Sequence, residues 1–416
     1  MKFKYLIFLS LLLIGAHLSA QESPVPKHWG WEIGYTQGRV IVVDKLQKQW
    51  QKGKNNGALY FQLNQSYLPS DSVAFAADYG YPTLSFGLKY HFNHGVTMHR
   101  TNDPNLYVDY ISGMGNILTG YGNFSRPFSR HEHWETDYNI GLGVAYSKKR
   151  YNPYTNVDNE MIGARWMLYV GLGLHATYHF VPEWGIKGGL EYYHHSNGTL
   201  RKPNKGGNFI GPTLALVYTP YYSETLQEKQ TWKPQEIDKY WFMNLSFGFG
   251  GKALHEQWMQ SQQMRKEGKQ EYQQAHFNVY AAVSGQVDLM YRYARRWASG
   301  IGFDMFYGTY ADKVRKIDES NDRNYKHSPW SWAIAFKHQA YYQDWSVNIG
   351  AGYYLYRHMG YTSKSVEKPY YERVGLFYHI PQLDGMALGL NVKAHLGKAD
   401  FTELCLTMPV KLKFNK

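Results

Sequence analysis

The feature that most constrains the fold is a strict alternation of side chains near the end of the sequence. From Leu404 to Phe414 every even position is apolar, and the positions between them are Cys, Thr, Pro, Lys and Lys. A period of two is the pattern of a β-strand whose two faces meet different surroundings. About 9–11 residues are enough for a tilted strand to cross a bilayer. We therefore predict an amphipathic, membrane-spanning strand here.

The same alternation recurs throughout the sequence. It is clear at 84–92, 241–249 and 301–307, where apolar side chains again occupy every second position. Counting such runs predicts about sixteen antiparallel strands, with about eight on each side of the polar stretch 223–239. After residue 20 no segment approaches about 18 consecutive apolar residues, which excludes membrane-spanning helices.

The first residues have the composition of a secretory signal peptide. Lys2 and Lys4 precede a short apolar run from Tyr5 to Ala16, and the stretch ends in the small residue Ala20. The run is too short for a membrane-spanning helix. We predict that residues 1–20 direct export and are then removed.

The overall composition suits an exported barrel. Aromatic residues make up 17% of the chain, with 38 Tyr and 13 Trp, and there are 40 Gly. Mean hydropathy is nevertheless −0.53, as expected where only one face of each strand meets lipid and aromatic girdles mark its borders. The single cysteine, Cys405, excludes an internal disulfide. The net charge of +12 favours anionic partners, and the phosphates of outer-membrane lipids fit an exported barrel better than nucleic acid does.

These features together predict an all-β protein, an antiparallel β-barrel of the bacterial outer membrane. We expect one barrel of about sixteen strands, and two tandem barrels of about eight strands each are the alternative. The expected parts are an N-terminal half at 21–222, a polar linker at 223–239 and a C-terminal half at 240–416. Residues 179–198 resemble residues 379–398. The second half is therefore a candidate degenerate repeat of the first.

Polar side chains gather at one predicted hairpin, GLEYYHHSNGTLRKPNKGGNFIGPTLALVY. On its first strand the even positions are apolar, so His194 and Ser196 share the face predicted to meet lipid. His195 and Asn197 are predicted to point inward. On the returning strand Asn208 shares the parity of the outward apolar residues. Polar residues near strand ends are common in the headgroup region, so position alone does not make a site.

The three outward polar residues have the chemistry for ester hydrolysis. Serine attacks an ester when a neighbouring base takes its proton, and an i, i+2 pair on one strand face brings His194 beside Ser196. A third group should fix the tautomer of the imidazole and stabilise its charged form. The side-chain oxygen of Asn208 can do the first, but it carries no charge for the second.

The stretch HHSNGTLRKPNKGGN, residues 194–208, resembles the active-site segment of the lipid A 3-O-deacylase (PagL) / acyloxyacyl hydrolase family. Members are outer-membrane barrels that remove an acyl chain from lipopolysaccharide. The family pattern is His, any residue, Ser and Asn, then a Pro-Asn loop that leads to an acidic residue. By this resemblance His194 is the base and Ser196 the nucleophile, and Asn208 stands where the family has its acidic residue. The likeness extends over about residues 135–220 and is fairly specific, because it is spread over the whole stretch.

The resemblance also implies roles for four neighbours. Asn197 follows the nucleophile, where the family implicates this neighbourhood, including Gly198, in holding the oxyanion. Pro203 and Asn204 match the family's Pro-Asn loop.

The sequence thus predicts a serine-type outer-membrane esterase that removes an ester-linked acyl chain from lipid A of lipopolysaccharide. Its partners would be lipopolysaccharide and outer-membrane lipids. The alternative is a non-catalytic channel or structural barrel derived from that family. The Asn at the acidic position and the length of the chain support the alternative. In the second half Ala394 and Leu396 stand in place of His194 and Ser196, so any chemistry at this hairpin belongs to the first half.

Hydrolysis by such a group needs neither a cofactor nor a metal. Two loosely spaced histidine pairs, His131 with His133 and His175 with His179, could still suggest a metal site. His175 and His179 share the parity of the inward positions of their strand. We expect both to line a wet lumen.

Overall fold

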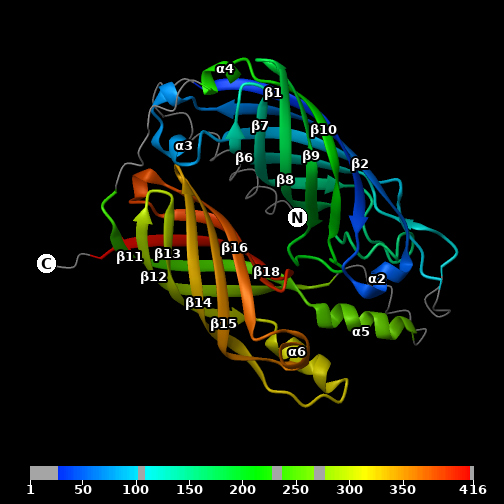
Figure 1. Ribbon diagram of the computed structural model, residues 1–416. Helices are drawn as coiled ribbons and strands as arrows, with labels where there is room; N and C mark the ends of the chain where they lie inside the picture. Colours follow the sequence, from blue (N-terminus) through cyan, green and yellow to red (C-terminus); the bar gives the residue numbers. More distant parts are fainter. Residues whose placement is uncertain (1–26, 102–107, 227–236, 267–276, 413–416) are drawn as a thin grey trace.

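The computed structural model describes residues 27–101, 108–226, 237–266 and 277–412. Within these residues strands dominate, and two barrels lie side by side (Figure 1). The predicted signal peptide at 1–20 and most of the predicted linker at 223–239 lie outside the described residues. None of the described helices is long and apolar enough to cross a membrane.

The first barrel is a closed ring of antiparallel strands. Its strands are β1 (His28–Ile41), β2 (Gln51–Ser66), β3 (Thr83–Phe92), β6 (Ile117–Arg130), β7 (Trp134–Ser147), β8 (Trp166–Val181), β9 (Trp184–Ser196) and β10 (Gly207–Tyr218). The ring closes at β1, which pairs with β2 on one side and with β10 on the other. Trp31 of β1, for example, lies opposite both Leu63 of β2 and Tyr218 of β10.

The second barrel is also closed and antiparallel. Its strands are β11 (Tyr240–Ala253), β12 (Val279–Ala294), β13 (Trp297–Gly308), β14 (His327–Tyr342), β15 (Trp345–Met359), β16 (Tyr370–His379), β17 (Ala387–His395) and β18 (Lys398–Lys411). Here β11 closes the ring by pairing with β12 and β18, and Phe247 lies opposite both Gly285 and Leu406.

The expected single barrel of about sixteen strands is therefore wrong, and the alternative of two tandem eight-stranded barrels is correct. The physical reason is the pairing of the first and last strands of each half. Since β1 hydrogen-bonds to β2 and β10, neither of its edges is left for the second half. In the same way, both edges of β11 are taken by β12 and β18.

Short elements decorate the connections. They are β4 (Val96–Met98), β5 (Ser112–Gly113), α2 (Lys45–Trp50), α3 (Ala74–Asp78), α4 (Tyr222–Thr225), α5 (His255–Lys266), α6 (Ala311–Glu319), and the single turns η2 (Pro69–Asp71), η5 (Thr362–Val366) and η6 (Pro381–Leu383). The described parts of the longest connections, which include β3 to β6, β7 to β8 and β11 to β12, lie at one end of both barrels (Figure 1). We call it the outer end, because outer-membrane barrels carry long loops outside and short turns in the periplasm.

The two faces of the strands are as the alternation predicts. Leu190 and Leu214 point outward and are 48% and 63% exposed, whereas their neighbours Glu191 and Ala215 are buried in the lumen. The outward faces of both barrels are apolar in this way along most strands. A lipid-facing surface of this kind needs no further partner in a bilayer.

Charged side chains fill both lumens. In the first barrel the Lys89 ammonium lies 2.7 Å from the Glu191 carboxylate. In the second, the Lys337 ammonium lies 2.6 Å from Asp304. All four side chains are buried, and a buried charge of this kind is tolerated because its partner is in contact.

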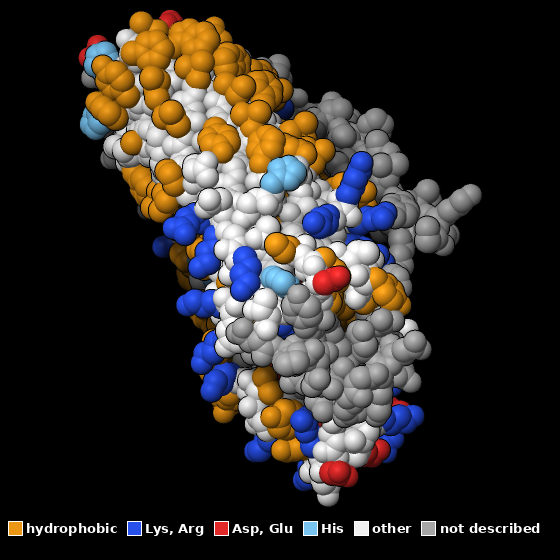
Figure 2. Space-filling view, turned by 90° about the vertical axis from the view of Figure 1, so that its right-hand side faces the viewer, with side chains coloured by type: hydrophobic (Ala, Val, Ile, Leu, Met, Phe, Trp, Pro, Cys, Tyr) orange, Lys and Arg blue, Asp and Glu red, His pale blue; other side chains and the backbone are white. Residues whose placement is uncertain are grey.

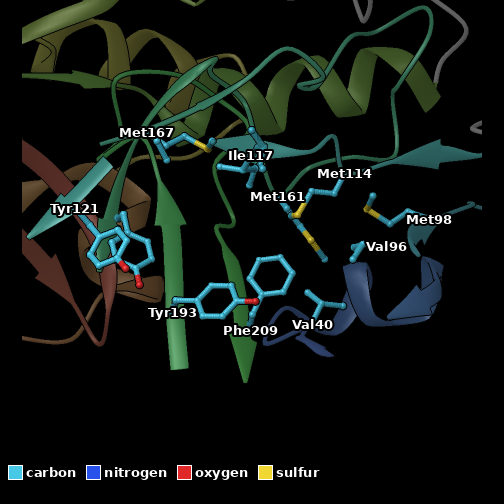
Figure 3. Packing of buried hydrophobic residues seen from close by; sticks show 13 residues of the cluster. Val40, Val96, Met98, Met114, Ile117, Tyr121, Met161, Met167, Tyr193 and Phe209 are labelled. Carbon is cyan, nitrogen blue, oxygen red and sulfur yellow. The ribbon is translucent and has the colours of Figure 1, made fainter. Parts of the chain in front are cut away.

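A hydrophobic cluster lies inside the first barrel near its outer end (Figure 3). Tyr193 of β9 and Phe209 of β10 stack there, with ring centroids 5.1 Å apart. Met114 and Met161, which come from the two long connections above the barrel, belong to the same cluster. This packing fixes the outer ends of β9 and β10, and their outward residues lie one position away from Tyr193 and Phe209.

At the opposite end, α3 of the first barrel packs against turns of the second. The Tyr79 hydroxyl donates a hydrogen bond to the carbonyl oxygen of Tyr341 at 2.9 Å. Arg295 lies 3.5 Å from Asp78. These contacts join the two barrels at the end opposite to the outer end.

Candidate active site

His194 and Asn208 form the centre of the candidate site. They lie directly opposite each other on β9 and β10, on the outward face near the outer end. The Nδ1 atom of His194 is 2.7 Å from Oδ1 of Asn208. An amide oxygen only accepts hydrogen bonds, so Nδ1 carries the proton and Nε2 is left as a base. The structure thus brings together two of the three predicted residues.

Ser196 is the last residue of β9 and shares the outward face with His194. It is half-buried and lies opposite Leu168 of β8. Successive residues on one strand face are about 6.7 Å apart along the chain, which places the serine and histidine side chains as neighbours. Both residues have the same even parity as Leu190, which is exposed on the outward face of this strand.

Two further residues shape the site, and the sequence analysis missed them. Tyr192 donates a hydrogen bond from its hydroxyl to Oδ1 of Asn208 at 2.8 Å. From its even position, the sequence predicts only that Tyr192 is one of the outward apolar residues. Gly206 has a φ of +75°, and a Cβ there would lie 2.5 Å from Cε1 of His194. The glycine therefore lets the imidazole lie against the backbone, and the paired glycines before Asn208 are the signal that could have found it.

Asn197, predicted to point inward, is buried and lies just beyond β9. The strand ends at Ser196, so alternation no longer applies, and Asn197 begins the connecting loop. Its backbone N–H donates to Oδ1 of Asn204 at 3.1 Å, and its own Oδ1 accepts from the N–H of Arg201 at 3.1 Å. Its Nδ2 is buried and has no hydrogen-bond partner among the described residues. Buried donors are usually hydrogen-bonded, so this free amide is available to an acceptor atom of a ligand.

The loop from 197 to 206 is anchored on the connection between β7 and β8. The N–H groups of Lys205 and Gly206 donate to the carbonyls of Glu160 and Met161, each at 3.1 Å. The carbonyl of Pro203 approaches Gly163 so closely that no Cβ would fit at that glycine. Pro203 and Asn204 thus lie in the loop that joins β9 and β10.

His195 faces the lumen, as predicted, and is fully buried. Its ring lies against His91, with centroids 4.7 Å apart, and its Nε2 is 3.3 Å from the hydroxyl of Thr119. The pair of histidines at 194 and 195 is therefore split between two environments. Only His194 reaches the outward surface.

The histidine pairs that could suggest a metal have other partners. His175 faces inward as predicted, with Nδ1 3.3 Å from Asp137. His179 is also buried and stacks on Tyr222 at 3.5 Å between centroids. His133 lies in the turn between β6 and β7, where its Nδ1 is 3.0 Å from the carbonyl of His179. These contacts are structural hydrogen bonds and ring packing.

One group of possible metal ligands occurs in the second barrel. Ligand atoms of Glu367, His395 and Asp400 lie within 4.8 Å of one another. Arg357 already lies 2.6 Å from Glu367, and Lys393 lies 2.6 Å from Asp400. Two cations thus occupy the carboxylates, so the donor set fits an ion-pair network better than a cation site.

The fold and this surface define the class of protein. It is an outer-membrane β-barrel protein that carries a serine, a histidine and an asparagine together on its lipid-facing side. The family described as "Lipid A 3-O-deacylase (PagL)" matches residues 85–217, and "Acyloxyacyl hydrolase, C-terminal domain" matches residues 240–411. The chain belongs to the lipid A 3-O-deacylase (PagL) / acyloxyacyl hydrolase family, and each barrel corresponds to one of the two matches.

Comparison with solved structures returns matches that include the following two. The crystal structure of the outer membrane enzyme PagL shares 15% identity, with 45% of this chain and 98% of that chain covered and a TM-score of 0.28. The Acinetobacter baumannii protein OccAB4 shares 9% identity, with 95% and 99% covered and a TM-score of 0.21. No curated protein gives a significant match to the chain.

Proposed function

We propose that the protein is a serine-type esterase that removes an ester-linked acyl chain from lipid A of lipopolysaccharide. Ser196 acts as nucleophile, His194 as base and Asn208 as the residue that orients the base. The observation that carries the proposal is the 2.7 Å contact between His194 Nδ1 and Asn208 Oδ1 on the lipid side of the barrel. It points Nε2, the basic nitrogen, away from Asn208. The choice of the 3-position follows from the family and from no residue of this site.

The first half of the reaction transfers the acyl chain to the enzyme. Nε2 of His194 takes the hydroxyl proton of Ser196 as the serine oxygen attacks the ester carbonyl carbon. The tetrahedral intermediate then collapses, and the imidazolium returns the proton to the sugar oxygen that leaves. This step breaks the bond between the acyl carbon and the sugar oxygen. It leaves an acyl group on Ser196 and a free sugar hydroxyl.

The second half releases the fatty acid. A water molecule gives a proton to His194 as it attacks the acyl-serine carbonyl, and the proton then returns to the Ser196 oxygen. Asn208 keeps the imidazole in one tautomer through both steps. Because the amide oxygen is neutral, it stabilises the imidazolium less than a carboxylate would.

Asn197 is suited to stabilise the oxyanion of both intermediates. Its Nδ2 is buried, adjacent in sequence to the nucleophile and without an acceptor among the described residues. An unpaired donor of this kind can form its hydrogen bond as negative charge develops on the carbonyl oxygen, which stabilises the transition state. This role accords with the position that the family resemblance gives to Asn197.

The location of the site favours a lipid substrate. His194 and Ser196 lie on the outward face, so an acyl chain in the outer leaflet already lies against the surface that carries them. Figure 2 shows Lys and Arg side chains across the middle of one face of the molecule, below an area of hydrophobic side chains. Exposed basic residues of the outer connections include Lys148, Lys149 and Arg165. They suit the phosphates of an anionic lipid.

The alternative of an open channel has less support. A channel needs a continuous aqueous lumen, and both lumens are crossed by buried ion pairs. Lys89 and Glu191 occupy the first, and Arg373 and Glu403 the second. A structural barrel without activity would release no fatty acid from lipopolysaccharide.

The proposal is tested by Ser196→Ala, with fatty acid released from purified lipopolysaccharide as the readout and mass spectrometry of lipid A as confirmation. The matched control is Ser299→Ala. Ser299 lies on the outward face of the second barrel, and its hydroxyl is 2.9 Å from Nδ1 of His338. We expect Ser196→Ala to abolish release and Ser299→Ala to retain it. Full activity in folded Ser196→Ala would exclude this site as the source of hydrolysis.

A further inference from the structure

The lipid-facing pattern of the last strand is interrupted at one residue. Leu404 and Leu406 of β18 point outward and are 39% and 44% exposed. Thr402 occupies the next outward position toward the outer end, yet it is buried. A polar residue that is covered on a lipid face indicates a contact with another part of the protein.

The segment that covers Thr402 is the loop that follows Ser196. The Thr402 hydroxyl donates a hydrogen bond to the carbonyl oxygen of Gly198 at 2.7 Å. One residue on, the N–H of Ala253 donates to the carbonyl oxygen of Thr199 at 2.8 Å. Both donors belong to the second barrel and both acceptors to the first. Two consecutive carbonyls of the loop are therefore held by the other barrel.

The backbone at these two positions needs such support. Gly198 has a φ of +58° and Thr199 a φ of +79°. Left-handed backbone costs little at glycine but is unfavourable for a β-branched residue such as threonine. Strained conformations of this kind persist where surrounding contacts determine them. A Cβ at Gly198 would lie 2.2 Å from the hydroxyl of Thr402, so the close approach also requires glycine.

The contact bears directly on the proposed site. In a trans peptide the C=O and N–H point in opposite directions, so binding the Gly198 and Thr199 carbonyls sets the orientation of the following N–H groups. The N–H of Leu200 then turns back to the carbonyl of Asn197 at 3.3 Å. The second barrel thereby fixes the turn that holds Asn197, whose unpaired Nδ2 lies next to the nucleophile.

We propose that the second barrel completes the active site of the first, with Thr402 as a positioning residue that holds the Gly198–Thr199 turn and through it the oxyanion donor. The inference rests on the proposed function of Ser196. It gives the barrel that lacks the catalytic residues a role in the reaction at the other barrel. Asn197 would lose its fixed position when this support is removed, while the substrate would still find the same lipid-facing surface.

The test compares Thr402→Val with Thr407→Val in the full-length protein in detergent. Thr407 is a buried threonine of the same strand, and its hydroxyl is 3.0 Å from that of Ser246 inside the second barrel. We expect Thr402→Val to lower kcat for lipopolysaccharide deacylation about tenfold or more with KM changed less than about twofold, since a lost oxyanion interaction lowers kcat. Thr402→Ser should restore most of the rate, and Thr407→Val should leave it unchanged.

A fluorophosphonate probe, which labels activated serines, supplies a second readout. Thr402→Val should slow labelling of Ser196 in proportion to kcat. Heat-modifiable migration on gels reports folding, and Thr402→Ala replaces the valine variant if that variant does not fold. Activity of Thr402→Val equal to that of Thr407→Val would overturn the inference while leaving the function of Ser196 intact. Retained activity or labelling in Ser196→Ala would instead overturn the proposed function.

Discussion

The two barrels differ most at the hairpin formed by their last two strands. In the first barrel β9 and β10 are joined by the loop 197–206, which carries Asn197 and Gly206 of the candidate site. In the second, β17 and β18 are joined by a tight turn at Leu396 and Gly397, whose φ values are 51° and 73°. Positive φ at both central residues is typical of the two-residue turns that continue a hairpin most directly.

This difference separates what a barrel needs from what a hydrolase needs. The second barrel keeps the strands and the alternation but has Ala394 and Leu396 where the first has His194 and Ser196. With no loop of its own at this hairpin, β18 leaves Thr402 available to receive the loop of the first barrel. The scaffold is thus shared, and the chemistry belongs to one loop and the strand ends that flank it.

The largest expected effect comes from breaking the nucleophile–base pair. Ser196→Ala and His194→Ala should each lower kcat by about a thousandfold or more, and the double variant should lose little more, because the pair acts as a unit. Fatty acid release from lipopolysaccharide measures the loss. The converse change, Ala394→His with Leu396→Ser in the Ser196→Ala background, should restore nothing. Recovered activity in that variant would show that a His and a Ser on the strand ends are sufficient and that the loop 197–206 is not needed.

The next effect concerns the neutral residue at the acidic position. Asn208→Ala should lower kcat about ten- to a hundredfold, since the tautomer of His194 loses its partner but the nucleophile and base remain. Asn208→Glu should hold or raise the rate, because a carboxylate stabilises the imidazolium. That gain needs the ionised form, so it should disappear as pH falls in a pH–rate profile. A folded Asn208→Glu protein without activity would point to a role of the amide itself.

Two glycines with positive φ, one from each hairpin, give a sharper comparison. Gly206 and Gly397 have φ of +75° and +73°, so alanine strains the backbone at either by about 1 kcal/mol. A Cβ at Gly206 would meet His194, whereas nothing lies within 4 Å at Gly397. Gly206→Ala should therefore lose about tenfold in kcat or more, while Gly397→Ala should alter only the melting temperature. Equal activity of the two variants would show that the imidazole can relocate without cost.

Much of the fold follows from alternation, which is a local property. The runs at 84–92, 241–249 and 301–307 are strands β3, β11 and β13, and the outward face was correctly assigned. The number of barrels is a different kind of quantity. It depends on whether β1 pairs with β10 or with a strand of the second half, and both choices present the same alternating faces. Local pattern cannot distinguish them.

The site was predictable where residues share a strand face and less so beyond the strand. His194 and Asn208 meet because parity and hairpin pairing place them opposite each other. Asn197 lies one residue beyond the strand, where alternation no longer predicts the direction of a side chain. The contact of Gly198 with Thr402 joins residues far apart in the sequence, and only the packing of two barrels brings them together. Its single sequence signal is a threonine on an otherwise apolar face.

The smallest expected effect concerns two lysines of the loop 197–206 that face different barrels. Lys205 lies within the first barrel's own contacts, 2.8 Å from Asp44 and 2.7 Å from Glu160. Burial, and then the charge of Lys252 in the second barrel, lowers the pKa of Lys202 to about 8. The charged form of Lys202 is thus disfavoured by folding. Its penalty is complete below pH 8, declines as pH rises toward the unfolded pKa of about 10.4, and is absent above it.

Lys202→Met should therefore stabilise the protein at pH 7 by about 1 kcal/mol or more, and the gain should shrink between about pH 8 and pH 10. Lys205→Met should have the opposite sign, because it leaves Glu160, which is buried, with one cation fewer. Thermal melts followed by circular dichroism in detergent across this pH range measure both. If the two variants shift the melting temperature in the same direction, the loop does not divide its contacts between the barrels. A gain for Lys202→Met that persists undiminished at pH 10 would mean that lost charge is not its cause.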